Sequence, residues 1–215
     1  MSTPAAAPEL LRLDRVQIAF GQGTSSHVAV YDVSLTVRAG EVVGLVGESG
    51  SGKSLTCRTV LRLLPGDGQV TSGGVTLAGA DVLSMSTREL RNLRAHQVGM
   101  IFQDPFTSLN PTLRIGKQLI ETLRVNAGLS KSAARQRAIE LLVQVEIPLP
   151  VERMRAYPHE MSGGMQQRVM IAMALASDPQ LLLADEPTTA LDVSTQAQVL
   201  DLLRRIRDER GISIL

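Results

Sequence analysis

The feature that most restricts the fold of this chain is a glycine-rich octapeptide, GESGSGKS, at residues 47–54. It follows a short apolar run at 42–46 and leads into a stretch of helical character at 53–64. We expect a buried parallel strand, a loop and a helix, because glycines let successive backbone N–H groups turn inward without obstruction. The arrangement predicts a site for phosphate oxygens at the positive N-terminal end of the helix.

Every residue of this octapeptide is a candidate ligand of a nucleoside triphosphate. Lys53 should reach the β- and γ-phosphates, and the Ser54 hydroxyl should coordinate Mg²⁺. The alternative, a glycine-rich turn without a ligand, is disfavoured by the complete pattern and by the apolar run before it. The candidate nucleotide-binding residues are Gly47, Glu48, Ser49, Gly50, Ser51, Gly52, Lys53 and Ser54.

Length and composition exclude several classes of protein. The 215 residues are enough for one domain with a buried core. The net charge is +1, no basic tract is present and only 2% of residues are aromatic, which disfavours nucleic-acid binding. The single cysteine, Cys57, excludes an internal disulfide and is expected to be a small packing residue. No run approaches the roughly 20 apolar residues of a membrane helix, so a membrane role is expected to act through a partner.

Strand-like and helix-like patterns alternate along the chain. This alternation predicts an α/β fold, a P-loop NTPase core with a parallel sheet, an N-terminal antiparallel β subdomain and an inserted α-helical subdomain at about 105–176. We treat 1–215 as a single domain. The expected strands are 11–20, 28–37, 42–46, 73–77, 98–102, 181–184 and a last one from 212; the expected helices are 53–64, 87–94, 115–125, 132–145, 163–176 and 194–208.

Two carboxylates follow the apolar run at 181–184. The ends of strands in parallel sheets face the ligand crevice, so Asp185 and Glu186 are expected to lie beside the phosphate loop. Asp185 can hold Mg²⁺, and Glu186 can orient and deprotonate an attacking water. A helix-capping acidic pair before Pro187 is the structural alternative, which the co-occurrence of strand, pair and phosphate loop disfavours.

Ser162, Gly163 and Gly164 open a predicted helix and form a second candidate anion site. One nucleotide rarely needs two such helices from one chain. A two-fold dimer would use both, if each nucleotide lay between one subunit's phosphate loop and the other's Ser162 segment. From capping logic alone, the alternative of an N-cap serine followed by glycines that allow close packing is favoured.

On these residues the chain resembles the ATP-binding cassette (ABC) family. GESGSGKS resembles its Walker A motif, and LLLADEP at 181–187 resembles Walker B. MSGGMQQR at 161–168 resembles the family signature, with Met161 and Met165 in place of the usual leucine and glutamine. The resemblance implies ATP and Mg²⁺ as ligands and a dimer closed around the nucleotide.

The resemblance also implies roles for three further residues. Gln103 falls where the Q-loop glutamine contacts Mg²⁺ and the γ-phosphate, so it joins Lys53 and Glu186 as a catalytic candidate. Asp192, in TALD at 189–192, falls in the loop that crosses the dimer seam. Phe20 falls where an aromatic ring stacks on adenine, although an aromatic residue at a strand end is often part of the core.

Longer segments at 100–111, 157–176 and 185–203 resemble the ATPase subunits of dipeptide and oligopeptide importers, and those of nickel and glutathione importers. This implies a transport-coupled Mg-ATPase, peripheral on the cytoplasmic face of the membrane. The implied partners are a second ATPase subunit, identical or related, and transmembrane permease subunits. An extracytoplasmic solute-binding protein would act indirectly, and nucleic acid is not implied. We expect the permease to dock near Gln103 and the helical insert, beginning at 104–111.

One departure concerns the family's switch histidine, which follows the strand that begins near residue 212. The three histidines, His27, His96 and His159, lie elsewhere. We therefore expect a piece of a longer subunit that binds Mg-ATP and hydrolyses it more slowly.

Two alternatives to this function stay open. One is a soluble ABC ATPase acting on nucleic acid or ribosomes, which long coiled-coil insertions or a basic linker would favour. The other is a nucleotide-binding module with little hydrolysis.

Overall fold

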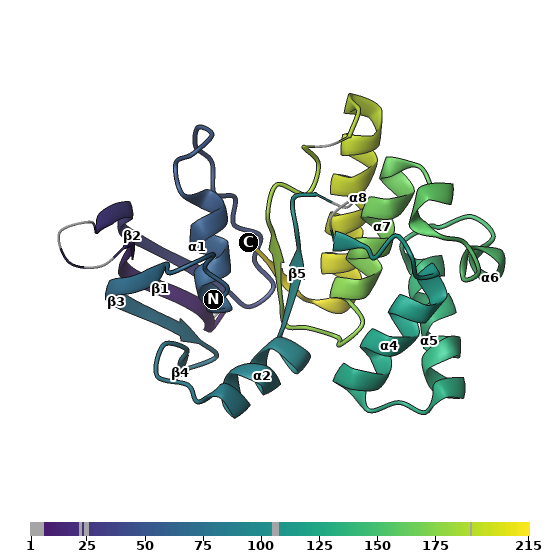
Figure 1. Ribbon diagram of the computed structural model, residues 1–215, viewed down its shortest axis with the longest axis horizontal. Coiled ribbons are helices and arrows are strands. Elements are labelled where there is room, and N and C mark those ends of the chain that lie inside the picture. Colours follow the sequence, from purple (N-terminus) through teal and green to yellow (C-terminus); the bar gives the residue numbers. More distant parts are fainter. Residues whose placement is uncertain (1–6, 22, 24–25, 105–107, 190) are drawn as a thin grey trace, which may run out of the picture.

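A computed structural model describes residues 7–21, 23, 26–104, 108–189 and 191–215. Figure 1 shows an antiparallel sheet at one end of the molecule, a group of helices at the other, and β5 in a second sheet between them. The fold is therefore built in the predicted parts: an antiparallel β subdomain, a parallel sheet and a helical subdomain. The limits of the insert at 105–176 remain a prediction, and residues 105–107 lie outside the described part.

The antiparallel sheet has the strand order β2-β1-β3-β4. Its first strand buries Leu11 and Leu13, then Val16 and Ile18, with a change of register between the two pairs. At this bulge Arg15 has a positive φ of 47°, so the strand keeps its apolar side chains on one face. The strands are β1 Glu9–Phe20, β2 His27–Arg38, β3 Gln69–Leu77 and β4 Ala80–Asp81.

The second sheet is parallel and separates two hydrophobic cores. It consists of β5 (Val98–Ile101), β6 (Leu181–Ala184) and β7 (Ser213–Ile214), with β6 in the centre. Along β6, Leu182 packs into the core of the helical side, while Leu181 and Leu183 pack into the core beneath the antiparallel sheet. A strand buried on both faces explains why this segment is continuously apolar.

Eight described helices surround these sheets, and several begin or end at residues suited to capping. Ser86 and Ser130 accept hydrogen bonds at the starts of α2 and α5, and Gly128 and Gly211 adopt the left-handed conformation after α4 and α8. The helices are α1 Lys53–Val60, α2 Thr87–His96, α4 Ile115–Ala127, α5 Lys131–Gln144, α6 Pro150–Arg153, the 3₁₀ helix η2 Pro158–Glu160, α7 Gly163–Ala174 and α8 Val193–Arg210.

Two predicted elements are longer than the structure shows by several residues, and the strand predicted at 73–77 is too short, because β3 begins at Gln69. The apolar run 42–46 is not a buried strand: only Val42 forms a parallel bridge, to Ile214, and the Val46 side chain is 95% exposed. The reason is that β7 is two residues long, so the hydrogen-bonded ladder ends where β7 ends. The first helix stops at Val60 and not at residue 64, because Arg62 turns into the left-handed region with a φ of 50°.

Replacing Leu182 with alanine tests whether β6 joins the two cores. The side chain is fully buried, so Leu182→Ala should lower the free energy of unfolding by about 2–5 kcal/mol, measured by urea denaturation. Val143 on α5 is exposed, and Val143→Ala should change the free energy by no more than about 0.5 kcal/mol. Equal effects of the two substitutions would contradict this assignment of the core.

Candidate active site

The glycine-rich segment forms an exposed loop that leads directly into α1. Gly52 is the N-cap residue of α1 with a φ of 91°, and no side chain caps this end of the helix. A Cβ atom on Gly52 would lie 2.6 Å from Val30, so only glycine allows the loop to pass this close to β2. The uncapped helix end leaves backbone N–H groups available to an anion, and phosphate binding at this end stays a prediction.

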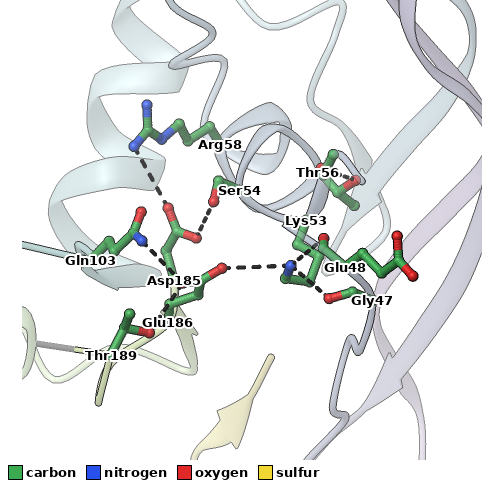
Figure 2. Close-up of polar contacts among 11 residues, drawn as sticks. Gly47, Glu48, Lys53, Ser54, Thr56, Arg58, Gln103, Asp185, Glu186 and Thr189 are labelled. Atoms are coloured by element: carbon green, nitrogen blue, oxygen red, sulfur yellow. Dashed lines mark hydrogen bonds and ion pairs between the residues drawn. The ribbon is translucent and has the colours of Figure 1, made fainter. Parts of the chain in front are cut away.

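Lys53 lies across the mouth of this loop. Its ammonium donates hydrogen bonds to the carbonyl oxygens of Gly47 and Glu48, each at 2.9 Å, and lies 3.5 Å from a carboxylate oxygen of Glu186. Figure 2 shows these three contacts converging on Nζ. The lysine is thus held by the loop on one side and by the end of β6 on the other.

Ser54 and Asp185 are the second contact between loop and strand. The Ser54 hydroxyl donates a 2.6 Å hydrogen bond to Oδ1 of Asp185, whose residue is only 2% exposed. Oδ2 of Asp185 lies 3.6 Å from the Arg58 guanidinium and accepts no hydrogen bond, although it is buried. The charge of Asp185 is therefore balanced from α1, while one oxygen retains unused capacity (Figure 2).

The donor atoms at this point fit Mg²⁺. A hydroxyl oxygen on Ser54 and a carboxylate with an unsatisfied oxygen on Asp185 are hard ligands of the kind that this ion prefers, and Gln103, hydrogen-bonded to the adjacent Glu186, carries a further amide oxygen. Among the described residues there is no group of three or more His, Cys, Asp or Glu able to hold a metal ion. Mg²⁺ usually binds through one or two protein oxygens together with substrate phosphates.

Glu186 is the centre of a small polar cluster. One of its carboxylate oxygens accepts hydrogen bonds from Nε2 of Gln103 and from the Thr189 hydroxyl, both at 3.0 Å, while the other faces Lys53. Glu186 itself has a φ of 47°, an unfavourable conformation for this residue type. Three side chains, those of Lys53, Gln103 and Thr189, thus meet at the Glu186 carboxylate (Figure 2).

Phe20 lies at the end of β1 and away from this cluster. Its ring stacks on His27, with centroids 5.7 Å apart and planes inclined by 20°, and it packs against Gly68 and the core beneath the antiparallel sheet. The residue is partly buried. Stacking on adenine stays a prediction.

Ser162 acts within the single chain as the N-cap of α7. Its hydroxyl accepts a hydrogen bond from the backbone N–H of Met165 at 3.3 Å. A Cβ atom on Gly164 would lie 2.7 Å from Thr195, so the glycine allows α7 and α8 to approach closely. Both features match the structural alternative. They leave open a role for Ser162, Gly163 and Gly164 toward the nucleotide of a second subunit, which stays a prediction.

Asp192 is likewise used as a helix cap, at the start of α8. Its carboxylate accepts hydrogen bonds from the Ser194 hydroxyl at 2.6 Å and from the backbone and side chain of Thr195 at 3.0 and 2.7 Å. These bonds, with that from Ser194 the strongest, hold the pKa of Asp192 well below its usual range. Its part in nucleotide binding stays a prediction.

Comparison with a sequence profile decides the family. The profile described as "ABC transporter" matches residues 30–189, which is most of the chain. The chain belongs to the ABC transporter family. A solved structure agrees: the dimeric post-hydrolysis state of the ATP-binding cassette MJ0796 bound to ADP and Pi superimposes with a TM-score of 0.83 at 31% identity, covering 95% of this chain and 86% of that one. The predicted α/β fold is therefore confirmed.

Curated relatives within the family carry peptide-transport names. The chain is 48% identical to the oligopeptide transport ATP-binding protein OppD of Salmonella typhimurium over 212 residues, 99% of this chain. It is also 48% identical to the dipeptide transport ATP-binding protein DppD of Escherichia coli over 206 residues, 96% of this chain. The chain spans 63% of the length of each of these relatives. In the described part of this ABC chain, no helix is both long and apolar enough to cross a membrane.

Two residues of the site were not predicted from the sequence. Arg58 balances the negative charge of Asp185. Thr189 donates a hydrogen bond to Glu186, whereas the sequence placed residues 189–192 only in the loop that contains Asp192. Arg58 follows Ser54 by four residues in α1, so one helical turn places both side chains on the same face. That spacing could have indicated Arg58, whereas the contact of Thr189 depends on how the chain turns after Glu186.

Cys57 gives this ABC chain a measurable dependence on alkaline pH. Burial and, second to it, the nearby negative charge of Asp185 raise the pKa of its thiol from 9.0 to about 12, while Arg58 opposes the shift. Between about pH 9 and 12 the unfolded chain loses this proton and the folded chain keeps it, so the free energy of unfolding should fall as pH rises. Urea denaturation across this range should show a steeper fall for the unsubstituted chain than for Cys57→Ala. Parallel curves would contradict the assignment.

Proposed function

We propose that this chain is the ATP-binding and ATP-hydrolysing part of an importer subunit, acting on peptides or related small solutes. The observation that carries the proposal is the convergence of Lys53, Ser54, Gln103, Asp185 and Glu186 at one end of the parallel sheet. These side chains supply a cation, two metal ligands and a candidate base within one cluster. Phosphoryl transfer requires this combination of positioning and charge neutralisation.

Each residue has a distinct role in the proposed reaction. Lys53 and the loop N–H groups hold the phosphates, and Ser54 with Asp185 holds Mg²⁺, which supplies charge neutralisation when bound. Glu186 orients the attacking water and accepts its proton. Gln103, already hydrogen-bonded to Glu186, senses the metal and the γ-phosphate. A bound phosphate would replace the Glu186 carboxylate as the partner of the Lys53 ammonium. The contact between Lys53 and Glu186 would then break, and Glu186 would be free to bind the attacking water.

A dimer is proposed to complete the site. The structural relative MJ0796 is dimeric in its state bound to ADP and Pi, and this supports the same assembly here. The start of α7 in one subunit, with Ser162, Gly163 and Gly164, would face the nucleotide on the phosphate loop of the other. The second subunit is either another copy of this chain or a related ATPase.

Peptide import is proposed from the similarity to the peptide-transport proteins OppD and DppD, each 48% identical to this chain. The subunit would lie on the cytoplasmic face of the membrane, bound to transmembrane permease subunits, with a solute-binding protein acting on the far side. Closure of the dimer around ATP would move the permease, and hydrolysis would release the dimer.

An apolar groove beside Gln103 suits the permease. It has a volume of about 510 Å³ between β5, α4 and α7, and its lining includes Leu63, Met100 and Phe102. Leu63 and Phe102 are exposed in the single chain, although both are apolar. The groove follows the Gln103 segment, so a permease helix docked there would contact the residue proposed to sense the nucleotide. Residues 105–107 of the predicted docking stretch lie outside the described part.

Lys53→Ala tests the phosphate site. ATP affinity should fall at least about tenfold, because a hydrogen bond to a charged group contributes about 1.5–3 kcal/mol. The affinity is measured by isothermal titration calorimetry with Mg-ATP. Arg88→Ala removes an exposed cation from α2 and should leave the affinity unchanged. Unchanged affinity in Lys53→Ala would remove this lysine from the site.

Glu186→Gln tests the base. In a single-turnover assay with protein in excess over ATP, phosphate release should slow by about 10²–10⁴, the usual contribution of general acid–base catalysis, while ATP affinity is kept. Glu209→Gln changes an exposed carboxylate on α8 and serves as the matched control. Phosphate release at the unsubstituted rate in Glu186→Gln would mean that another group activates the water.

A further inference from the structure

A strongly basic groove lies on the helical subdomain, separate from the nucleotide site and from the apolar groove. It has a volume of about 1040 Å³ and is bordered by α4, α5 and the segment around α6. Its lining contains one acidic residue, Glu121, and six basic ones. We call it the basic groove; its cations are Arg114, Lys117, Arg124, Lys131, Arg135 and Arg155.

These cations have no anionic partner in the described part of the chain. All six are exposed, and none of them lies within 4.0 Å of a carboxylate among the described residues. Arg114 lies 5.6 Å from the ring centroid of Tyr157, a contact that leaves its charge uncompensated. The whole chain carries 22 basic and 21 acidic residues, so the excess in the groove is local. Clustered like charges repel one another, and an anionic ligand would relieve that repulsion.

The backbone brings two walls of the basic groove together. The N–H groups of Ile115 and Gly116 donate to the carbonyl oxygens of Ala156 and Met154, at 2.9 and 3.0 Å. A Cβ atom on Gly116 would lie 2.5 Å from the Met154 oxygen, so the absence of a side chain allows this approach. Arg155, between the two acceptor residues, is thereby fixed beside the first turn of α4. Backbone contacts therefore fix the relative position of the two walls of the basic groove.

Exposed apolar side chains accompany these cations. Val125 is 76% exposed and Val151 is 52% exposed, and both line the same groove. Cations together with exposed aliphatic side chains are typical of surfaces that rest on a lipid headgroup layer, where the cations meet phosphates and the aliphatic groups reach the acyl boundary. A nucleic acid is matched less well, because no aromatic side chain for base stacking lines the groove in the described residues.

We propose that the basic groove binds the headgroups of anionic phospholipids and so brings the helical subdomain to the membrane surface. Four of its six cations are arginines, whose planar guanidinium groups bind phosphate oxygens in pairs. The proposal does not require the permease. Where a permease does dock in the apolar groove, as proposed above, α4 faces both partners, because Thr122 and Asn126 line the apolar groove while Lys117 and Arg124 line the basic one.

Vesicle flotation with the whole chain tests this proposal. The chain should float with vesicles of phosphatidylcholine mixed with phosphatidylglycerol, should not float with phosphatidylcholine alone, and should be released as sodium chloride is raised. The double substitution Lys117→Glu with Arg124→Glu should weaken binding at least about tenfold. The matched control, Arg88→Glu with Arg91→Glu, reverses two exposed arginines on α2 and should bind as the unsubstituted chain does. Absence of binding to the anionic vesicles, or equal losses in both variants, would overturn the proposal.

Two further arms separate a lipid surface from other anions. Val125→Ser with Val151→Ser keeps every charge and should still weaken vesicle binding several-fold, whereas Val143→Ser, outside the groove, should not. Inorganic phosphate at matched ionic strength should not release the chain from vesicles; release would identify a site for free phosphate. Loss of affinity for a duplex oligonucleotide or an acidic polypeptide in the charge-reversal variant, with vesicle binding intact, would also overturn the assignment. Circular dichroism confirms that each variant is folded.

Discussion

The hydrogen bond between Ser54 and Asp185 is the contact on which the site depends. A buried carboxylate is costly unless hydrogen bonds and opposite charges compensate it, and here both come from α1, through Ser54 and Arg58. The helix that follows the phosphate loop is therefore tied to the end of the central strand. Because Glu186 is the next residue, the same contact sets the distance between the loop and the candidate base, which Lys53 then spans.

The central strand can have this role because β6 is packed from both sides. Its alternate side chains pack into different cores, so repacking of either core would shift the backbone that positions Asp185 and Glu186. The antiparallel sheet and α1 support the loop from one side. The helices of the other side border the apolar groove next to the Gln103 segment, so the proposed nucleotide and permease contacts would lie at the two ends of that segment.

A second electrostatic contact orients the helical subdomain. Glu146, just after α5, accepts a 2.6 Å hydrogen bond from Arg168 on α7 and pairs with Arg205 on α8. Hydrogen bonds from these two arginines, with Arg168 first, lower the pKa of Glu146. Three helices are thus joined at one carboxylate, and the helix that begins at Ser162 is fixed relative to the central sheet. Any approach of a second subunit's nucleotide to Ser162 would therefore act on the whole helical subdomain.

Local sequence is sufficient for the parts of this protein that are contiguous. The phosphate loop with Lys53 and Ser54, the buried strand before Asp185 and Glu186, and the helix caps at Ser162 and Asp192 are all encoded within a few neighbouring residues, through glycine conformations, apolar runs and capping side chains. Which of these segments meet depends on the packing of the folded chain. Arg58 and Thr189 entered the site, and the run at 42–46 failed to become a buried strand, because long-range strand pairing and the compensation of buried charge depend on the packing of the whole chain. The grouping of six separate cations into one groove was decided in the same way, by the packing of α4, α5 and the α6 segment.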